Sequence, residues 1–251
     1  MVRRLGNYSR LASDEEAVIR QMLMLPVRFA PARRDLIAQG APPRAVFLIV
    51  SGWACQFKTL EDGRRQIVGF MLPGDTCDMN NLVLTRMDHS IGAVTDVRYM
   101  EVPGEALQRV AMNYPRIGRA FWWQMLVSIS TQREWTTNLG QRNALERLGS
   151  LLCELALRLQ AVGLAGGESY DLPLTQTDLA DATGLTSVHV NRTLQQMRTS
   201  GLISLSGRVL RIPNFAMLEE ASLFTADYLH TGQRDGRRGK DPFEASASSI
   251  W

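Results

Sequence analysis

Hydrophobic and polar positions alternate along the chain after residue 25. The run AVFLIV (45–50) ends at Ser-Gly, and the next run places Trp53, Cys55 and Phe57 on one face. An EDG turn (61–63) leads into RQIVGFML (65–72) and PGD, and SIGAVTDV and YMEV form a further strand pair before Pro103-Gly104. Short runs of period two between glycine turns are typical of antiparallel sheets. We predict a small antiparallel barrel or sandwich over residues 26–114.

The pattern becomes helical after Pro115. An apolar stripe recurs about every four residues, which predicts a helix over 115–140 that is longer than the average helix. Such stripes usually face a partner helix, although an ordinary core helix is the alternative. Trp122, Trp123 and Trp135 widen the stripe, so one side can pack on the barrel and the other on a second copy. The residues expected to pair two copies are Phe121, Met125, Ile129, Gln132, Thr136 and Leu139.

Three other segments complete the organisation. Residues 1–25 contain a short predicted helix, which Ser13 can cap and whose first turn carries Asp14, Glu15 and Glu16 at the positive end of the helix dipole. ALERLGSLLCELALRLQAVGL (144–164) predicts a second amphipathic helix. Periodicity ends after about 222, and the polar, Gly/Ser/Arg-rich residues 223–251 are expected to form a disordered tail.

LTQTDLADATGLTSVHVNRTL (174–194) predicts a helix-turn-helix. Thr175 can cap the first helix, with Asp178 three positions later as in a capping box. Gly184 supplies a left-handed turn, and Thr186 can cap the second helix. GLISLSGRVLRI then predicts a two-stranded wing with Gly207-Arg208 at its tip. We therefore predict a DNA-binding domain over residues 141–222.

Charge supports this interpretation only through its placement. The net charge of +3 is compatible with nucleic acid, and residues 192–211 contain four arginines and no acidic residue. Arg, Asn, Ser and His suit base edges, so we expect base contacts from Ser187, His189, Asn191 and Arg192. We expect phosphate contacts from Gln176, Thr177, Thr186 and Arg208, with Thr175 and Val188 on the same surface.

The order of these parts resembles the CRP/FNR family of bacterial transcription regulators. The resemblance covers about 25–220 and rests on FLIVSGWACQFKTLEDGRRQIVGFMLPGD, RNALERLGSLLCELALRL and the helix-turn-helix with its wing. It implies an α+β protein with a cyclic-nucleotide-binding-like β-roll sensor, a long dimerisation helix and a winged helix-turn-helix, closer to the FNR side. It further implies a homodimer on palindromic double-stranded DNA, contact with RNA polymerase and control by a small-molecule effector.

Departures from the family pattern bear on the effector. Where cyclic-AMP-binding members carry Gly-Glu after the GD turn, this chain has Asp78-Met79, and where they carry the phosphate-pairing Arg-Ser it has His89-Ser90. Their base-contacting Thr-Ser falls at Gln132-Arg133. Without the arginine a charge-assisted pair is lost, so we do not expect cyclic-nucleotide binding.

No cofactor is expected either. The iron–sulfur members use N-terminal cysteines, but no cysteine precedes Cys55. Haem members ligate through a Cys and a His close together, whereas the nearest histidine to Cys77 is His89. The three cysteines fit neither a disulfide framework nor a metal motif. One hypothesis stays open, a pocket for an unknown small or redox effector lined by Cys77, Asp78, Met79, His89, Ser90 and Arg133.

The reading helix also departs from its relatives. Val188 occupies the position of a family glutamate, which accepts from cytosine N4, whereas valine can only touch a thymine methyl. We therefore do not assign the DNA half-site of other family members to this protein. Cyclic-nucleotide-responsive and haem- or redox-responsive regulators remain alternatives, as does an interaction module that has lost DNA binding.

Other function classes lack support in the sequence. G-x-S-x-G, H-E-x-x-H and P-loop motifs are absent, so we do not expect an enzyme. No apolar run approaches a membrane span and the N-terminus has no apolar signal core, so we expect a cytoplasmic protein that does not enter membranes. The effector, the operator, the regulated genes, activation versus repression and the role of the tail stay open.

Overall fold

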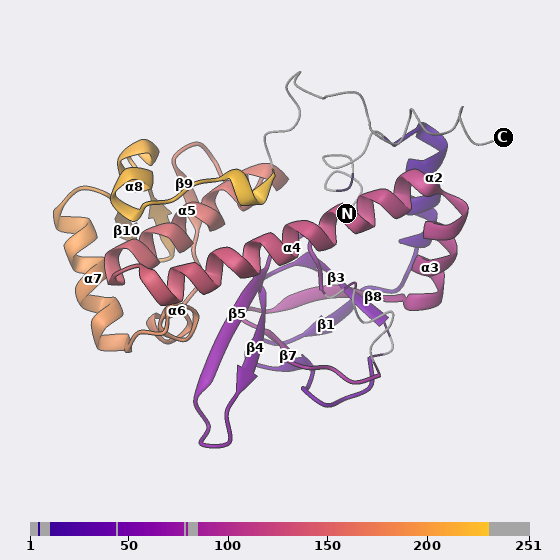
Figure 1. Cartoon of the computed structure of the whole chain (residues 1–251), viewed down its shortest axis with the longest axis horizontal. Helices are drawn as coiled ribbons and strands as arrows, with labels where there is room; N and C mark the ends of the chain where they lie inside the picture. The colour runs from indigo at the N-terminus through magenta and orange to yellow at the C-terminus, as the bar shows by residue number, and fades with distance from the viewer. Residues whose placement is uncertain (1–4, 6–10, 44, 78, 80–84, 231–251) are drawn as a thin grey trace.

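The computed structural model describes residues 5, 11–43, 45–77, 79 and 85–230. Helix α4 (Pro115–Gln141) runs through the molecule, with a β-roll packed along it and the C-terminal helical domain at its C-terminal end (Figure 1). None of the helices in the described ranges is long and apolar enough to cross a membrane.

The β-roll consists of two four-stranded antiparallel sheets, ordered β1-β8-β3-β6 and β2-β7-β4-β5. This confirms the predicted antiparallel barrel or sandwich. The strands are β1 (Arg28–Ala30), β2 (Asp35–Ile37), β3 (Ala45–Ser51), β4 (Ala54–Thr59), β5 (Arg65–Met71), β6 (Thr76–Cys77), β7 (Ser90–Ala93) and β8 (Val97–Pro103). The short strands β1, β2 and β6 were not predicted, because two or three residues carry too little periodicity.

The last two strands of the roll correct one prediction. They were expected to pair with each other, but β7 pairs with β4 and β2, whereas β8 pairs with β3 and β1. Val94 and Thr95 both donate to the carbonyl of Trp53, so the chain crosses from one sheet to the other between the two strands. Adjacency in sequence therefore does not give adjacency in the sheet here.

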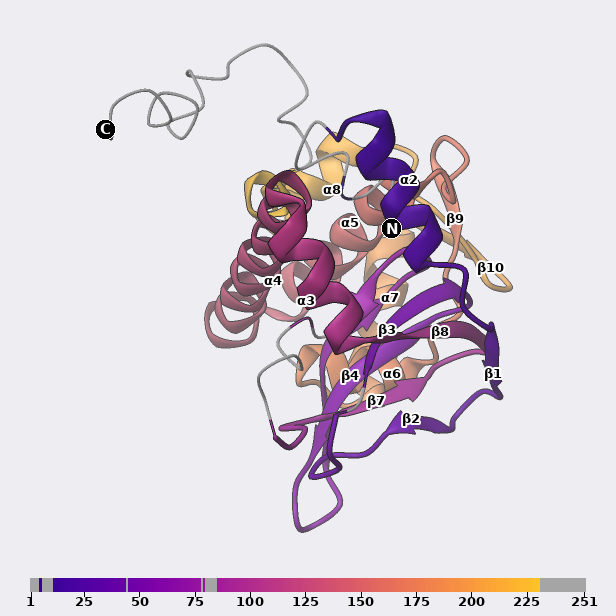
Figure 2. The ribbon, with the colours of Figure 1, turned by 90° about the vertical axis from the view of Figure 1, so that its right-hand side faces the viewer.

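Three helices close one end of the roll. Helices α2 (Ser13–Met22), α3 (Gly104–Asn113) and the first half of α4 enclose a cluster that includes Ile19, Leu107 and Ile117 (Figure 2). Ser13 is the first residue of α2 rather than its cap. The Glu15 carboxylate accepts a hydrogen bond from the Ala12 amide at 2.8 Å and satisfies the helix start instead. Helix α3 was not predicted.

The C-terminal domain has the predicted helix-turn-helix and wing. Its elements are α5 (Ala144–Val162), β9 (Ser169–Asp171), α6 (Gln176–Thr183), α7 (Ser187–Thr199), β10 (Ser204–Ser206), β11 (Val209–Arg211), α8 (Phe215–Ser222) and η2 (Asp227–Leu229). The wing strands β10 and β11 gain a third strand, β9, which the sequence pattern did not indicate.

The disordered tail was predicted to begin at residue 223, and this boundary is wrong. Phe224 and Leu229 are buried in the core, and the ring of His230 lies 5.7 Å from that of Trp123 on α4. Ordered structure therefore extends at least to residue 230. The rest of the predicted tail, 231–251, lies outside the described residues.

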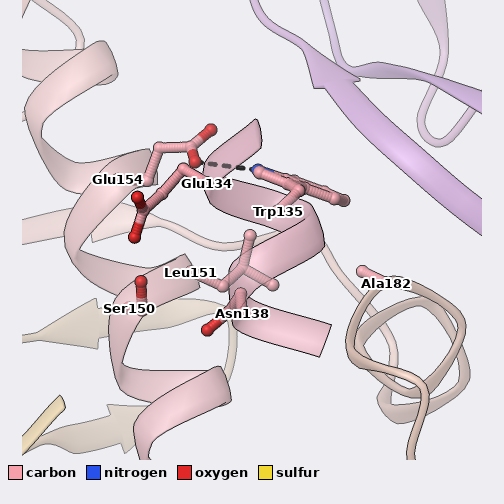
Figure 3. A pocket seen from close by; sticks show the side chains of 7 residues that line it. All are labelled: Glu134, Trp135, Asn138, Ser150, Leu151, Glu154 and Ala182. Carbon is pink, nitrogen blue, oxygen red and sulfur yellow. Dashed lines mark hydrogen bonds between the residues drawn. The ribbon is translucent and has the colours of Figure 1, made fainter. Parts of the chain in front are cut away.

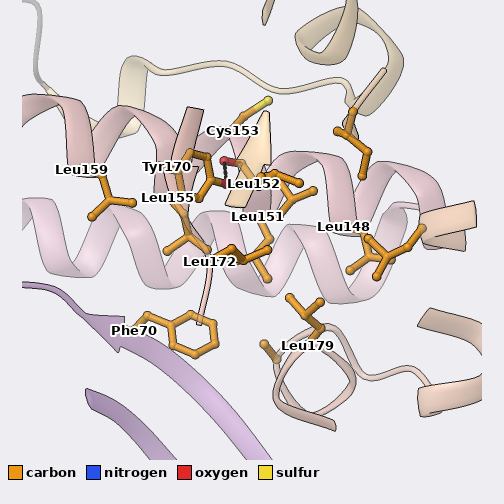
Figure 4. Packing of buried hydrophobic residues seen from close by; sticks show 14 of the residues in the cluster. Phe70, Leu148, Leu151, Leu152, Cys153, Leu155, Leu159, Tyr170, Leu172 and Leu179 are labelled. Carbon is orange, nitrogen blue, oxygen red and sulfur yellow. Dashed lines mark hydrogen bonds between the residues drawn. The ribbon is translucent and has the colours of Figure 1, made fainter. Parts of the chain in front are cut away.

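The β-roll and the C-terminal domain share one hydrophobic cluster. Phe70 of β5 packs edge-on against Trp53 and Trp135, and the same cluster contains the leucines of α5 and Leu179 of α6 (Figure 4). The alternation of Trp53, Cys55 and Phe57 is confirmed, because all three enter this cluster. A continuous core fixes the position of the helix-turn-helix on the roll.

Candidate DNA-binding interface

Local hydrogen bonds build the helix-turn-helix as the sequence predicted. Thr175 Oγ1 accepts from the Asp178 amide at 3.1 Å, and Asp178 Oδ2 accepts from the Thr175 amide at 2.9 Å, which forms the capping box of α6. Gly184 has φ of 65°, in the left-handed region that costs other residues energy. Thr186 Oγ1 accepts from the His189 amide at 3.2 Å and caps α7. These bonds set the angle at which α7 leaves the turn.

Helix α7 presents one polar-rich ridge to solvent. Val190, Leu194 and Met197 bury its inner face in the core. Its outer ridge, here called the α7 ridge, comprises Val188, Asn191, Arg192 and Gln195, all exposed. The predicted Ser187 and His189 lie half-buried at its margin. Gln195 was missed in the sequence, although its spacing of seven residues from Val188 places it on the same helical face.

The residues predicted to contact phosphate are all exposed. Thr175, Gln176 and Thr177 are exposed at the start of α6, and Thr186 is exposed at the start of α7. Helix N-termini favour anions through free amides and the helix dipole. Arg208 is exposed at the wing tip, 3.4 Å from Asp171, in a pair too exposed to immobilise it. These groups are the candidate phosphate contacts, and each individual DNA contact stays a prediction.

An interdomain seam fastens α6 to the β-roll. We define it as Arg33, Arg65 and Gln66 of the roll with Asp178, Asp181 and Ala182 of α6. Arg33 donates to both oxygens of Asp178, at 2.5 and 2.8 Å. Arg65 lies 3.9 Å from Asp181, and Gln66 donates to the Ala182 carbonyl at 3.5 Å. Bidentate guanidinium–carboxylate pairs also fix orientation, so the seam positions α6 as well as holding it.

The carboxylates of the seam have opposite pKa shifts. Burial acts to raise the pKa of Asp178, but the hydrogen bonds from Arg33 and Thr175 outweigh it and hold that pKa below its ordinary value. The pKa of Asp181 is raised, mainly by burial, because Arg65 is too distant to compensate. The Arg33–Asp178 pair is therefore the strong element of the seam.

A second polar network joins the roll to α4, α5 and the C-terminal segment. Arg158 of α5 donates to Asp75 Oδ2 at 2.6 Å, to the Phe70 carbonyl at 2.7 Å and to Glu154 Oε1 at 2.8 Å. Glu154 also accepts from Trp135 Nε1 at 2.9 Å (Figure 3). The Tyr228 hydroxyl donates to the same carboxylate at 2.9 Å. A small pocket between α4, α5 and α6 lies beside it. Burial and the adjacent Glu154 raise the pKa of Tyr228, which keeps its hydroxyl a donor.

Comparison with known proteins gives the family. The model for the Crp-like helix-turn-helix domain matches residues 146–221, and that for the cyclic nucleotide-binding domain matches 27–114. The chain is 32% identical to the transcriptional activator protein FnrL of Cereibacter sphaeroides, over 85% of this chain and 86% of that protein. It is 33% identical to the nitrogen fixation regulation protein FixK of Azorhizobium caulinodans, over 80% of this chain and 82% of that protein.

The chain belongs to the CRP/FNR family of DNA-binding transcription regulators, on the FNR side. The solved structure of FixK2 from Bradyrhizobium japonicum superposes with a TM-score of 0.72 at 27% identity, covering 79% of this chain and 98% of that one. The predicted fold class, an α+β protein with sensor roll, long helix and winged helix-turn-helix, is confirmed.

In this CRP/FNR regulator, the described side chains of the suggested effector pocket lie in different surroundings. Cys77 is fully buried among the side chains between the sheets, whereas Met79 packs in the cluster under α2 and α3. In a continuous strand Cys77 and Met79 would face the same side, but strand β6 ends at Cys77. Gln124 of α4 donates to Thr76, and Arg133 is exposed nine residues, or about 13.5 Å, further along α4.

The remaining pocket candidates have partners of their own. His89 Nδ1 lies 2.8 Å from Asp88 Oδ1, and its Nε2 lies 3.3 Å from Gln56 Nε2. Ser90 Oγ accepts from the Gln39 amide at 2.9 Å. Asp78 lies outside the described residues. Within the described residues no group of three or more His, Cys, Asp and Glu side chains could hold a metal ion.

Three of the six residues predicted to pair two copies through α4 instead face the chain's own β-roll. Phe121 is buried with the cluster under α2 and α3, Met125 packs against that cluster, and Gln132 donates to the Val68 carbonyl at 2.7 Å. Leu139 faces Gly184, while Ile129 and Thr136 are exposed. The apolar side of α4 that remains exposed, here called the α4 ridge, is Trp122, Leu126 and Ile129. Apolar residues occupy two sides of this helix, and sequence periodicity did not show which side the roll covers.

Proposed function

We propose that this protein binds palindromic double-stranded DNA as a homodimer, with one α7 in the major groove of each half-site. The outward α7 ridge, on a helix whose opposite face is anchored in the core, carries this proposal. The exposed α4 ridge supplies the apolar surface for pairing two copies. Half-sites then lie about one helical turn, roughly 34 Å, apart.

The ridge offers distinct readout chemistry. Arg192 can donate two hydrogen bonds to guanine, whereas Asn191 and Gln195 suit adenine. The starts of α6 and α7 and the wing tip at Arg208 hold phosphates on either side. The base contacts select a sequence, and the phosphate contacts fix the register.

Control through the β-roll belongs to the same proposal. The roll matches a cyclic nucleotide-binding domain, and the Arg33–Asp178 pair of the seam links it directly to α6. An unidentified effector would act by shifting the population of domain arrangements, with RNA polymerase as the expected partner on DNA. We expect no iron–sulfur cluster, haem or other cofactor. Cyclic-nucleotide control is the second candidate, and calorimetry with cyclic AMP and cyclic GMP tests it directly.

Selection of bound sequences from random DNA, with and without cell extract, tests the DNA-binding proposal. We expect a two-fold symmetric site, and Arg192→Ala to cost about 1–3 kcal/mol at one base position per half-site. Arg198→Ala, at the other end of α7, is the charge-matched control. Equal losses of Arg192→Ala on specific and random DNA would show that Arg192 contacts only phosphate. Recovery of no consensus would overturn the proposal.

A further inference from the structure

The face of α7 that points away from the core begins with an exposed apolar side chain. Val188 is 81% exposed on the first turn of the helix, and it begins the α7 ridge that continues through Asn191, Arg192 and Gln195. Neighbouring valine Val190 is fully buried, so the core gains nothing from Val188. A side chain in this position contacts whatever molecule binds against the α7 ridge.

We infer that Val188 determines specificity by packing on the C5-methyl group of a thymine, an inference that rests on the proposed DNA binding. The thymine methyl is the apolar group that bases present in the major groove, where their other edge atoms are donors and acceptors. Valine has neither a donor nor an acceptor, so a cytosine amino group at this place would lose its water without gaining a partner. The same position therefore rejects a C·G pair while accepting T·A.

The geometry of the helix favours this role. A valine in a helix occupies one strongly preferred rotamer, so its two methyl groups point in a fixed direction before DNA binds. Burying them against the thymine methyl consequently costs little side-chain entropy. Neither Ser187 nor His189, which are half-buried at the ridge margin, projects as far into solvent.

Spacing along α7 locates the thymine relative to the base read by Arg192. Arg192 lies four positions after Val188, which corresponds to about 6 Å along the helix. That length spans at most about two base-pair steps of 3.4 Å each, because a helix inclined in the groove advances less along the DNA axis. We expect the thymine within about two positions of the guanine in each half-site.

Replacing single thymines by deoxyuridine removes only the methyl group, and this substitution scan tests the inference. For the wild-type protein, one thymine per half-site should show about four-fold weaker binding on replacement, because one buried methyl group is lost. In Val188→Ala this difference should disappear at that position and persist elsewhere. The site should lie within about two base pairs of the position affected by Arg192→Ala.

A gain-of-function variant provides an independent arm. Val188→Glu should move the preference at the same position from thymine to cytosine, because a carboxylate accepts from cytosine N4. Val188 is exposed, so both variants should keep the wild-type melting temperature, which verifies folding. A deoxyuridine effect that survives Val188→Ala would overturn the inference and leave sequence-specific binding intact. Loss of all sequence preference in the wild-type protein would instead remove the proposed function and the inference with it.

Discussion

Arg33 of the β-roll bonds to Asp178 of α6, a residue 145 positions later in the sequence. It adopts φ of 66°, a left-handed conformation that costs a non-glycine residue roughly 1–2 kcal/mol. Its bidentate bond to Asp178, whose side chain is 1% exposed, offsets that cost. Local sequence patterns do not reveal pairs between distant residues. The sequence therefore predicted the capping box of Asp178 with Thr175 but not the bond from Arg33 to Asp178.

Arg33→Ala should lower the free energy of unfolding by about 1–2 kcal/mol, since it removes two charge-assisted bonds to a buried carboxylate. The value is modest because the Arg33 side chain is half-exposed and Thr175 still bonds Asp178. Urea unfolding followed by circular dichroism measures it. Arg34→Ala removes the same charge from the next, exposed position and should change little. Equal effects of the two substitutions would contradict a specific role for Arg33.

Acidification should reduce the difference in unfolding free energy between the wild-type protein and Arg33→Ala. The folded-state pKa of Asp178 lies below its ordinary value of about 3.9, so its contribution is complete above that value and is lost as pH falls through the folded pKa. The gap in unfolding free energy between wild type and Arg33→Ala should therefore be constant near neutrality and close below about pH 4. Asp181 shifts in the opposite direction, but the comparison of two variants largely cancels it. A gap that persists at low pH would exclude ionised Asp178 as its source.

The cysteine side chains bear on redox control. All three are buried, and desolvation raises the pKa of Cys55 to about 11, against the opposing effect of Arg65, and that of Cys153 to about 12. Neutral, inaccessible thiols react slowly. We expect no rapid reaction with a disulfide reagent at pH 8, and three reactive thiols after denaturation. A fast-reacting thiol in the native protein would revive a thiol-based sensor, and single Cys→Ser variants would locate it.

At the scale of elements, the structure was predictable wherever local chemistry determines it. Thr175, Gly184 and Thr186 specify two caps and a turn within twelve residues, and α6 and α7 follow them closely. Strand β9 and helix α3 lack such signals and were missed. The face of α4 depends on what packs beside it, so its periodicity predicted a helix but not the orientation of that helix.

Two glycines in helices offer a matched test of packing. A methyl group at Gly149 of α5 would lie 2.6 Å from Ser222 Cβ of α8, whereas at Gly140 of α4 it would meet nothing within 4 Å. Gly149→Ala should therefore lower the free energy of unfolding by about 1–3 kcal/mol through overpacking. Gly140→Ala should leave it unchanged or slightly raise it, because alanine favours helices. Thermal melts distinguish the two, and an unaffected Gly149→Ala would show that α8 can move away from α5.

At the scale of the whole molecule, the order of parts was predictable but their attachment was not. The sequence indicated a roll, a long helix and a DNA-binding domain with a tail from 223. The structure joins the first and third through one hydrophobic cluster, the seam and the Arg158 network. It also places Tyr228 against Glu154, so the C-terminal segment contributes to the same connection. Contacts between residues so far apart in sequence require the three-dimensional structure.

The exposed α4 ridge yields the prediction that decides the assembly. Leu126 is 53% exposed between Trp122 and Ile129, so a single chain would tolerate a carboxylate there. In a dimer paired through the α4 ridge, the same substitution would bury two like charges against each other. Leu126→Glu should convert a dimer of about twice 28.0 kDa into monomers by sedimentation equilibrium. Its melting temperature should then no longer depend on protein concentration. Binding to a palindromic site should weaken strongly, since one copy holds only one half-site.

Met112→Glu is the control for this test, because Met112 is an 82%-exposed apolar residue of a different helix, α3. It should retain the dimer and its DNA affinity. If both variants stay dimeric, the pairing surface lies elsewhere on the molecule. If the wild-type protein is itself monomeric at the concentrations at which it binds DNA, the two-fold symmetric site loses its basis, and each α7 would have to read its half-site alone.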